Sequence, residues 1–384
     1  DNHNWMVQDY AHHPTELSAL LHWAENCYPD HRICWVFQPH RYSRTRHLMD
    51  GFARVISRTD AVLIPEYAAF EHFDASGTSK GLQERISHLN TRPAELMESP
   101  SDLLDWMRRL SDHPSVYLFA GAGDIDKWAK WVLASWDTGS FEDQWMKYTT
   151  GLVMPQTRLA VNESLKNKMS LNVGGNARFY AEPSSAGDLQ ILMKTAALLR
   201  LQTVVMGRGS NLLADDSGFE GLVIRLNQPA WRGMSDLGEG RIWARAGLSL
   251  KELARKAASL GFSGFEFLEG IPGSVGGALR MNAGAMGREM RDILEQVELL
   301  SQDGRVVRVP AADLILGYRS SPGLDGYVVM GAVLKGTPGK DPEVIHETMD
   351  GYSKRRKSTQ PWEPSAGCIF RNPPAMSAGK LIDE

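Results

Sequence analysis

The sequence contains few of the residues that mark secreted, metal-binding or membrane proteins. Only three cysteines, Cys27, Cys34 and Cys368, occur in 384 residues, which is too few for a disulfide framework and fits a reducing compartment. No CxxC or paired Cys/His spacing suggests a zinc site, so no metal is expected. We find no apolar run long enough to span a membrane and expect no signal peptide, which favours a cytoplasmic protein without membrane insertion.

A strong excess of charge of one sign is also absent. The net charge is −4 and the pI is about 6.3, so no nucleic-acid partner is expected. The run Lys354-Arg355-Arg356-Lys357 is the one dense positive cluster, and its default interpretation is a solvated helix end. The chain lacks an initiating Met and stops within a patterned segment, which suggests a fragment of a longer polypeptide.

Residues 1–136 alternate short apolar runs with amphipathic segments. Four apolar residues recur at i, i+3, i+4 and i+7, the period of one helix face: Leu17, Leu20, Leu21 and Ala24. Pro14 suits the first helical position. This alternation is typical of an α/β unit with a mainly parallel, Rossmann-like sheet, in which ligands collect at the carboxyl ends of strands. The expected strands are residues 33–37, 61–64 and 116–121, and the loops expected at such ends are residues 9–16 and 37–45.

The pattern changes after a segment without periodicity. Residues 137–157 mix glycine, proline, threonine and charges with scattered aromatics, and we interpret them as a linker. An α+β pattern follows from about residue 158. Its expected elements are a strand, glycine loop and strand over 203–226, a helix over 249–262, a hairpin over 297–310 that turns at Asp303-Gly304, and a strand over 326–335.

Two segments are rich in glycine. Residues 264–287 contain seven glycines, which are costly to order because glycine loses the most conformational freedom on folding. Residues 207–211, GRGSN, offer a further run of backbone N–H groups suited to a pyrophosphate. Tight turns are the simpler interpretation, but two such loops in one domain favour a dinucleotide held by the backbone.

Cys368 lies in the segment PSAGCIFRNP, residues 364–373. Its thiol could be a nucleophile, a proton donor, a metal ligand or a buried apolar group. On residue types alone a buried thiol is favoured, because free cysteine is among the most buried residue types.

Six stretches, in this order and spacing, resemble the UDP-N-acetylenolpyruvoylglucosamine reductases, the flavoenzymes that complete muramic acid synthesis. They are NVGGNARF (172–179), GRGSNLL (207–213), LEGIPGSVGGALRMNAGAMG (268–287), GYRSS (317–321), PSAGCIFRNP (364–373) and SAGKLID (377–383). The resemblance implies a two-lobed FAD-binding domain over 158–338 and the incomplete start of a substrate-binding domain over 339–384. It assigns flavin contacts to Gly207, Gly209, Ser210, Asn211, Leu212, Ile271, Pro272, Gly273, Ser274, Gly276, Gly277, Asn282, Ala283 and Gly284.

The resemblance also implies a reaction in peptidoglycan precursor synthesis. In that family NADPH reduces FAD, and a hydride then passes to C3 of UDP-N-acetylglucosamine enolpyruvate to give UDP-N-acetylmuramate. Arg319 matches the arginine that stabilises the substrate carboxylate and the developing charge. Cys368 stands where the family usually has the serine that protonates C2, and a thiol with a pKa of about 8.5 suits that role. The family's terminal glutamate is expected beyond Glu384, and further candidates for binding the UDP-sugar are Tyr352, Arg356, Lys357 and Asn372.

The first domain resembles the C-terminal domain of UDP-N-acetylmuramate–L-alanine ligase. The matching stretches are DYAHHPTE (9–16), FQPHRYSRT (37–45) and LFAGAGDID (118–126). No G-x-x-x-x-G-K-[S/T] loop for ATP occurs in the chain, so ligase activity is expected only with upstream ligase domains of the same polypeptide. The amino acid contacts that the resemblance assigns are Tyr10, His12, Arg41 and Arg44, where guanidinium groups suit a carboxylate.

Two alternatives to a fused ligase–reductase are considered. Another FAD-dependent oxidase of the same flavin-binding fold would share the glycine loops, but not GYRSS together with PSAGCIFRNP. A non-catalytic module that assembles pathway enzymes would use the ligase domain as a tether. A phosphate-binding loop upstream in the same reading frame would argue against tethering alone.

Overall fold

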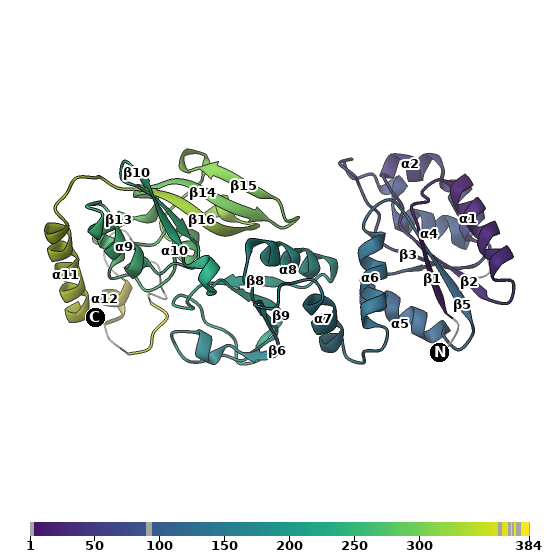
Figure 1. Ribbon diagram of the computed structural model, residues 1–384, viewed down its shortest axis with the longest axis horizontal. Coiled ribbons are helices and arrows are strands. Elements are labelled where there is room, and N and C mark those ends of the chain that lie inside the picture. Colours follow the sequence, from purple (N-terminus) through teal and green to yellow (C-terminus); the bar gives the residue numbers. More distant parts are fainter. Residues whose placement is uncertain are drawn as a thin grey trace. The chain divides into compact units, whose positions relative to one another are not determined.

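The computed structural model describes residues 4–89, 94–359, 363–367, 370, 372–373 and 378–383, without the side chain of Asp383 (Figure 1). The chain divides into two compact units, Asp1–Tyr148 and Thr149–Glu384. Each unit has its own sheets and core. The fold combines an α/β unit with an α+β unit, as the sequence predicts.

The first unit is built on a five-stranded sheet in which all the pairings are parallel. The predicted helix begins at Pro14, and the three predicted strands are present. The strand order is β1 (Trp5–Asp9), β5 (Ser115–Ala120), β2 (Arg32–Phe37), β3 (Asp60–Leu63) and β4 (Glu95–Leu96).

Alternate side chains of the central strands face opposite layers of helices. Trp35 and Leu118 pack into one core with residues of α1 (Pro14–Cys27), α3 (Met49–Ile56) and α4 (Ser79–Ser87). On the other side, the Tyr117 hydroxyl donates to the carbonyl oxygen of Met107 in α5 (Pro100–Leu110), at 3.0 Å. Figure 1 shows the strands of this unit between α1 on one side and α5 and α6 (Ile125–Ser135) on the other. The sheet is therefore covered on both faces, as parallel sheets usually are.

The segment 137–157 differs from the irregular linker that its composition suggests. Helix α7 (Phe141–Thr150) lies within it, and the division between the units falls after Tyr148. Trp145 is fully buried, and the ring of Tyr148 lies 4.9 Å from that of Trp131. One face of α7 carries three aromatic residues at i, i+4 and i+7: Phe141, Trp145 and Tyr148. Packing of this aromatic face stabilises the helix.

The second unit contains two larger sheets. In one, β6 (Arg158–Ser164) pairs antiparallel with β7 (Asn176–Glu182), and β9 (Phe219–Arg225) pairs parallel with both β7 and β8 (Thr203–Met206). The other sheet is antiparallel throughout. Its order is β10 (Met234–Gly238), β11 (Arg241–Arg245), β16 (Tyr327–Lys335), β14 (Leu294–Ser301) and β15 (Val306–Pro310). The predicted strand–loop–strand, hairpin and final strand are all present.

Helices and short strands of the second unit carry most of the remaining sequence motifs. The predicted helix over 249–262 is α9 (Leu250–Ser259), whose cap is the Ser249 hydroxyl. A small ladder of β12 (Gly284–Ala285) and β13 (Arg288–Glu289) forms at the end of the glycine segment 264–287. The other helices are α8 (Ala186–Leu198), α10 (Val275–Arg280), α11 (Pro342–Thr359) and α12 (Ala378–Asp383).

Candidate functional site

A cavity of about 1350 Å³ lies within the second unit, between the two glycine segments. Such a volume exceeds the roughly 300–1,000 Å³ of ordinary ligand pockets, so it has room for a dinucleotide and a further ligand. Every residue predicted to contact flavin, except Asn282, lines this cavity: Gly207, Gly209, Ser210, Asn211, Leu212, Ile271, Pro272, Gly273, Ser274, Gly276, Gly277, Ala283 and Gly284.

The two glycine segments are packed directly against each other. The Ser210 hydroxyl donates to the carbonyl oxygen of Pro272 at 2.9 Å. A Cβ atom at Gly207 would lie 2.3 Å from the hydroxyl oxygen of Ser274, so a larger residue there would force this side chain to move. Loop-to-loop contact therefore requires part of the glycine content, in addition to any approach of the backbone to a ligand.

Gly209 is also required by the protein itself. It has a φ of +68°, and a Cβ there would lie 2.1 Å from the carbonyl oxygen of Lys168. Gly277 is different, because its Cβ would meet only the Ser274 hydroxyl, at an ordinary 3.6 Å. Since Gly277 lines the cavity, the space beside it is available to a ligand.

Arg319 reaches this cavity from the loop before β16. Its Nη2 donates to the carbonyl oxygen of Gly284 at 2.9 Å, and its Nη1 donates to that of Asn282 at 3.3 Å. Asn282 does not line the cavity; its side chain is fully buried and bonded within the protein. Asn282 was predicted to contact the flavin, but its side-chain amide is bonded within the protein interior.

Helix α11 contributes the basic side of the cavity. Tyr352 and Arg356 line it, as expected, together with Arg355 and Thr359, which the sequence analysis did not select. These four positions follow the i, i+3, i+4, i+7 spacing of one helix face, and that spacing was the signal that could have found them. Lys357, the neighbouring candidate, is exposed and is not among the lining residues.

The candidates after α11 are only partly described. Cys368 lies outside the described residues. Gly367, which precedes it, lines the cavity, and a Cβ there would lie 3.9 Å from the side-chain oxygen of Asn211. The Asn372 side chain accepts a hydrogen bond of 2.9 Å from the backbone N–H of Ala378, and Asn372 is not among the lining residues.

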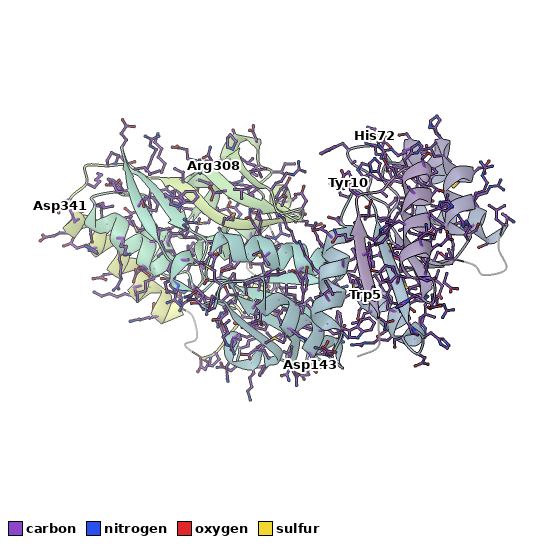
Figure 2. The ribbon with its side chains drawn as sticks, turned by 45° about the vertical axis from the view of Figure 1, so that its right-hand side comes forward. Trp5, Tyr10, His72, Asp143, Arg308 and Asp341 are labelled. Carbon is purple, nitrogen blue, oxygen red and sulfur yellow. The ribbon has the colours of Figure 1, made fainter. Side chains whose placement is uncertain are left out.

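The four predicted contacts of the first unit lie after strands β1 and β2. Tyr10 follows β1 and is two-thirds exposed, and Figure 2 shows it at the end of β1 opposite Trp5. The ring centroids of Tyr10 and His12 lie 5.3 Å apart, and those of His12 and His40 lie 6.0 Å apart. The guanidinium of Arg44 lies 3.3 Å from Nδ1 of His40. His40, which was not predicted, thus joins His12 to Arg44.

His40 and Arg41 are held by the loop after β3. The His40 ring stacks on Tyr67 at 5.6 Å, and the backbone N–H of Arg41 donates to the carbonyl oxygen of Tyr67 at 2.8 Å. Burial, together with the charges of Arg44 and Arg41, lowers the pKa of His40 below its usual value. A neutral ring is therefore favoured there, and the positive charge of this surface comes from the two arginines.

Among the described residues, no group of three or more His, Cys, Asp or Glu side chains could hold a metal ion. No helix in the described ranges combines the length and apolar character needed to cross a membrane.

Comparison with known proteins matches both units. Residues 177–310 match the family model described as an FAD binding domain, and residues 1–123 match the model described as the glutamate ligase domain of Mur ligases. A UDP-N-acetylenolpyruvoylglucosamine reductase of Synechococcus sp. is 43% identical over 217 residues, which are 56% of this chain and 69% of that protein. The chain belongs to this reductase family. It also carries a Mur ligase C-terminal domain at its N-terminus.

Other members of the reductase family agree with this placement. The reductase of Geotalea uraniireducens is 40% identical, over 59% of this chain and 74% of its own length. The crystal structure of the reductase of Thermus caldophilus matches with a TM-score of 0.51 and 38% identity, covering 59% of this chain and 79% of that one. The FAD binding domain match, residues 177–310, includes both glycine segments of the cavity, whereas Arg319 and α11 lie beyond residue 310.

Proposed function

We propose that the second unit reduces UDP-N-acetylglucosamine enolpyruvate to UDP-N-acetylmuramate, with FAD as cofactor and NADPH as the reductant. The observation that carries this proposal is the shared cavity, which brings both glycine segments, Arg319 and the basic face of α11 together. An oxidase of the same fold would also need the glycine segments. An oxidase reaction does not explain why Arg319, Arg355 and Arg356 line the same cavity. A UDP-sugar and NADPH as substrates also support a cytoplasmic location.

The cavity fits a flavin dinucleotide. It is large, it is lined by backbone of both glycine segments, and the space beside Gly277 is one that an added Cβ would enter. The residues that would hold FAD are the cavity-lining members of these segments, with Ser210 fixing one segment to the other. When bound, the flavin supplies the hydride that C3 of the substrate receives.

The protein's own residues supply charge stabilisation and a proton. The guanidinium of Arg319, which lines the cavity, would stabilise the enolate-like charge that develops beside the substrate carboxylate. Cys368 is our candidate for the acid that protonates C2, because its thiol carries one transferable proton. Tyr352, Arg355 and Arg356 offer a hydroxyl and two guanidinium groups to the diphosphate and sugar.

For the first unit we propose the amino acid-binding part of a UDP-N-acetylmuramate–L-alanine ligase. Tyr10, His12, Arg41 and Arg44 surround an exposed, positively charged surface at the ends of parallel strands, which suits a carboxylate. The ATP-dependent activity would require upstream ligase domains in the same polypeptide. Both units would then act in peptidoglycan precursor synthesis.

Anaerobic half-reactions test the reductase proposal. The full-length protein loaded with FAD should be bleached by NADPH and recover its absorbance on addition of UDP-N-acetylglucosamine enolpyruvate, and acid precipitation should release the flavin. Repeating the first step with NADH measures the nucleotide preference. Reoxidation by oxygen but not by the enolpyruvyl substrate would favour an oxidase, and failure to bind FAD would refute the proposal.

A further inference from the structure

The guanidinium of Arg319 is held at the cavity by backbone oxygens. The carbonyl oxygens of Gly284 and Asn282 accept from its two terminal nitrogens, at 2.9 and 3.3 Å. Its backbone is left-handed, with a φ of +52°, a conformation that a bulky residue adopts only when its surroundings impose it. The placement of Arg319 must therefore be explained by the residues that fix its loop and its side chain.

Asn282 fixes that loop from the protein interior. Its side-chain amide nitrogen donates to the carbonyl oxygen of Gly317 at 2.8 Å and to Oε2 of Glu289 at 3.0 Å. Its side-chain oxygen accepts from the backbone N–H of Arg291 at 3.0 Å. Because Asn282 is fully buried, its hydrogen-bonding capacity is used within the protein, where it joins residues 289–291 to the loop at Gly317.

Glu289 completes the arrangement with a charge. Its Oε1 lies 3.7 Å from Nη1 of Arg319, and its Oε2 lies 3.0 Å from Nε of Arg291. At 3.7 Å the carboxylate attracts the guanidinium without a hydrogen bond, so it occupies none of the N–H groups of Arg319 beyond those bonded to the two carbonyl oxygens. The Glu289 side chain is 18% exposed, which limits solvent screening of this attraction.

We propose that Glu289 is a positioning residue for the reductase reaction, acting through Arg319. It holds the guanidinium against the Gly284 carbonyl and, through Asn282, ties this position to the loop that carries Arg319. The inference rests on the proposed reductase function. A carboxylate beside an anion-binding site would normally repel the ligand. Here Arg291 balances the negative charge of Glu289, and Glu289 gives the guanidinium of Arg319 a fixed orientation.

The test is the isosteric variant Glu289→Gln in the full-length, FAD-loaded protein. Reoxidation of the reduced flavin by the enolpyruvyl substrate should slow by on the order of 10- to 100-fold, the range expected for a displaced catalytic group. Reduction by NADPH should be unchanged, since Arg319 has no part in it. In the Arg319→Ala background, Glu289→Gln should cause no further loss, because the effect passes through Arg319.

Glu298→Gln is the matched control. Glu298 is a nearly buried carboxylate paired with Arg308 at 2.9 Å, and it does not line the cavity. It should leave both half-reactions at the parental rates. Parental reoxidation rates in Glu289→Gln, or an equal loss in the Arg319→Ala background, would overturn the inference.

A readout without turnover separates this inference from the proposed function. Nitrogen relaxation of the Arg319 Nε–Hε group in flavin-free protein should report greater side-chain motion in Glu289→Gln than in the parent or in Glu298→Gln. If the parent is not reoxidised by the substrate but the motion increases as expected, the proposed function fails and the positioning contact stands. Equal motion in parent and Glu289→Gln would refute the positioning role itself.

Discussion

The hydroxyl group of Ser210 donates a hydrogen bond of 2.9 Å to the carbonyl oxygen of Pro272, 62 residues further along the chain. This bond joins the two glycine segments at the wall of the cavity. The close packing of Gly207 against Ser274 also holds the two segments together. The backbone around the cavity is thus organised by protein contacts before any ligand arrives, which lowers the ordering cost of binding.

Gly277→Ala should separate flavin binding from stability. Gly277 lies inside α10, and its Cβ would make only one ordinary contact, so alanine should leave the flavin-free protein as stable or more stable by up to about 1 kcal/mol. The methyl group would enter the cavity and should weaken FAD binding by about tenfold or more, as expected for a loss of about 1.4 kcal/mol. Flavin fluorescence titration and thermal unfolding measure the two effects.

Gly209→Ala is the contrasting variant. Its positive φ and the nearby Lys168 carbonyl oxygen predict destabilisation of the flavin-free protein by roughly 1–3 kcal/mol. FAD binding at parental affinity in Gly277→Ala would show that no ligand approaches the backbone there.

Arg355→Ala and Lys357→Ala should differ in their effect on the UDP-sugar. Arg355 lines the cavity and Lys357 does not. Loss of a charge-assisted hydrogen bond, about 1.5–3 kcal/mol, should weaken UDP-sugar binding roughly 10- to 150-fold in Arg355→Ala. Lys357→Ala should bind within about twofold of the parent, because Lys357 does not line the cavity and an exposed charge outside it contributes little. Flavin absorbance titration measures both constants, and equal weakening would contradict the assignment of α11.

Cys368 is predicted from the sequence to be the acid for the second half-reaction. Cys368→Ala should leave flavin reduction by NADPH unchanged and slow reoxidation by the substrate by on the order of 10²–10⁴-fold. Cys368→Ser should retain much more activity, since a hydroxyl is the usual donor in the family. Stopped-flow absorbance resolves the two steps. Reoxidation at the parental rate in Cys368→Ala would make this residue a packing thiol.

Asp188 should stabilise the second unit in a pH-dependent manner. It accepts hydrogen bonds from the Met154 N–H at 3.0 Å and from the hydroxyls of Thr157 and Ser184, both at 2.8 Å. Burial alone would raise the pKa of Asp188, but these hydrogen bonds outweigh it and the pKa lies below its usual value. The stabilisation is therefore complete above the unfolded pKa of about 3.9 and is lost as pH falls through the folded pKa.

Asp188→Ala tests this directly. Urea unfolding at neutral pH should show a loss of roughly 1.5–3 kcal/mol, the value of a hydrogen bond to a charged group. The difference from the parent should shrink in acid, below about pH 4. Asp236→Ala removes an exposed carboxylate of β10 and should change stability by less than about 0.5 kcal/mol. A difference for Asp188→Ala that does not depend on pH would contradict the ionised role.

The 384-residue chain should have no ATP-dependent ligase activity, because it contains no G-x-x-x-x-G-K-[S/T] loop. A coupled assay with ATP, L-alanine and UDP-N-acetylmuramate should detect no ADP above background. Turnover in this assay would mean that the chain contains an ATP site of another kind.

Helices and strands whose apolar residues recur at a regular spacing were predicted from the sequence. Elements whose buried face is marked by only a few widely spaced side chains were not. The parallel strands, α1, α9 and the β14–β15 hairpin follow from apolar spacing and turn residues. Helix α7 was missed because only three aromatic residues mark its buried face. Arg355 was missed because adjacent basic residues look alike in a sequence, and only the rotation of a helix distinguishes their directions.

By itself the sequence determined the two units, the family and the two glycine segments of the cavity, because these follow from local spacing and from continuous motifs. Only the tertiary structure decided which groups face the ligand. In the folded chain the Asn282 side chain is buried and Glu289 lies beside Arg319. Position 209 must be glycine because the Lys168 carbonyl oxygen occupies the space that a Cβ would need. These relationships join residues far apart in the chain, and steric contact and hydrogen bonding across such distances leave no period in the sequence.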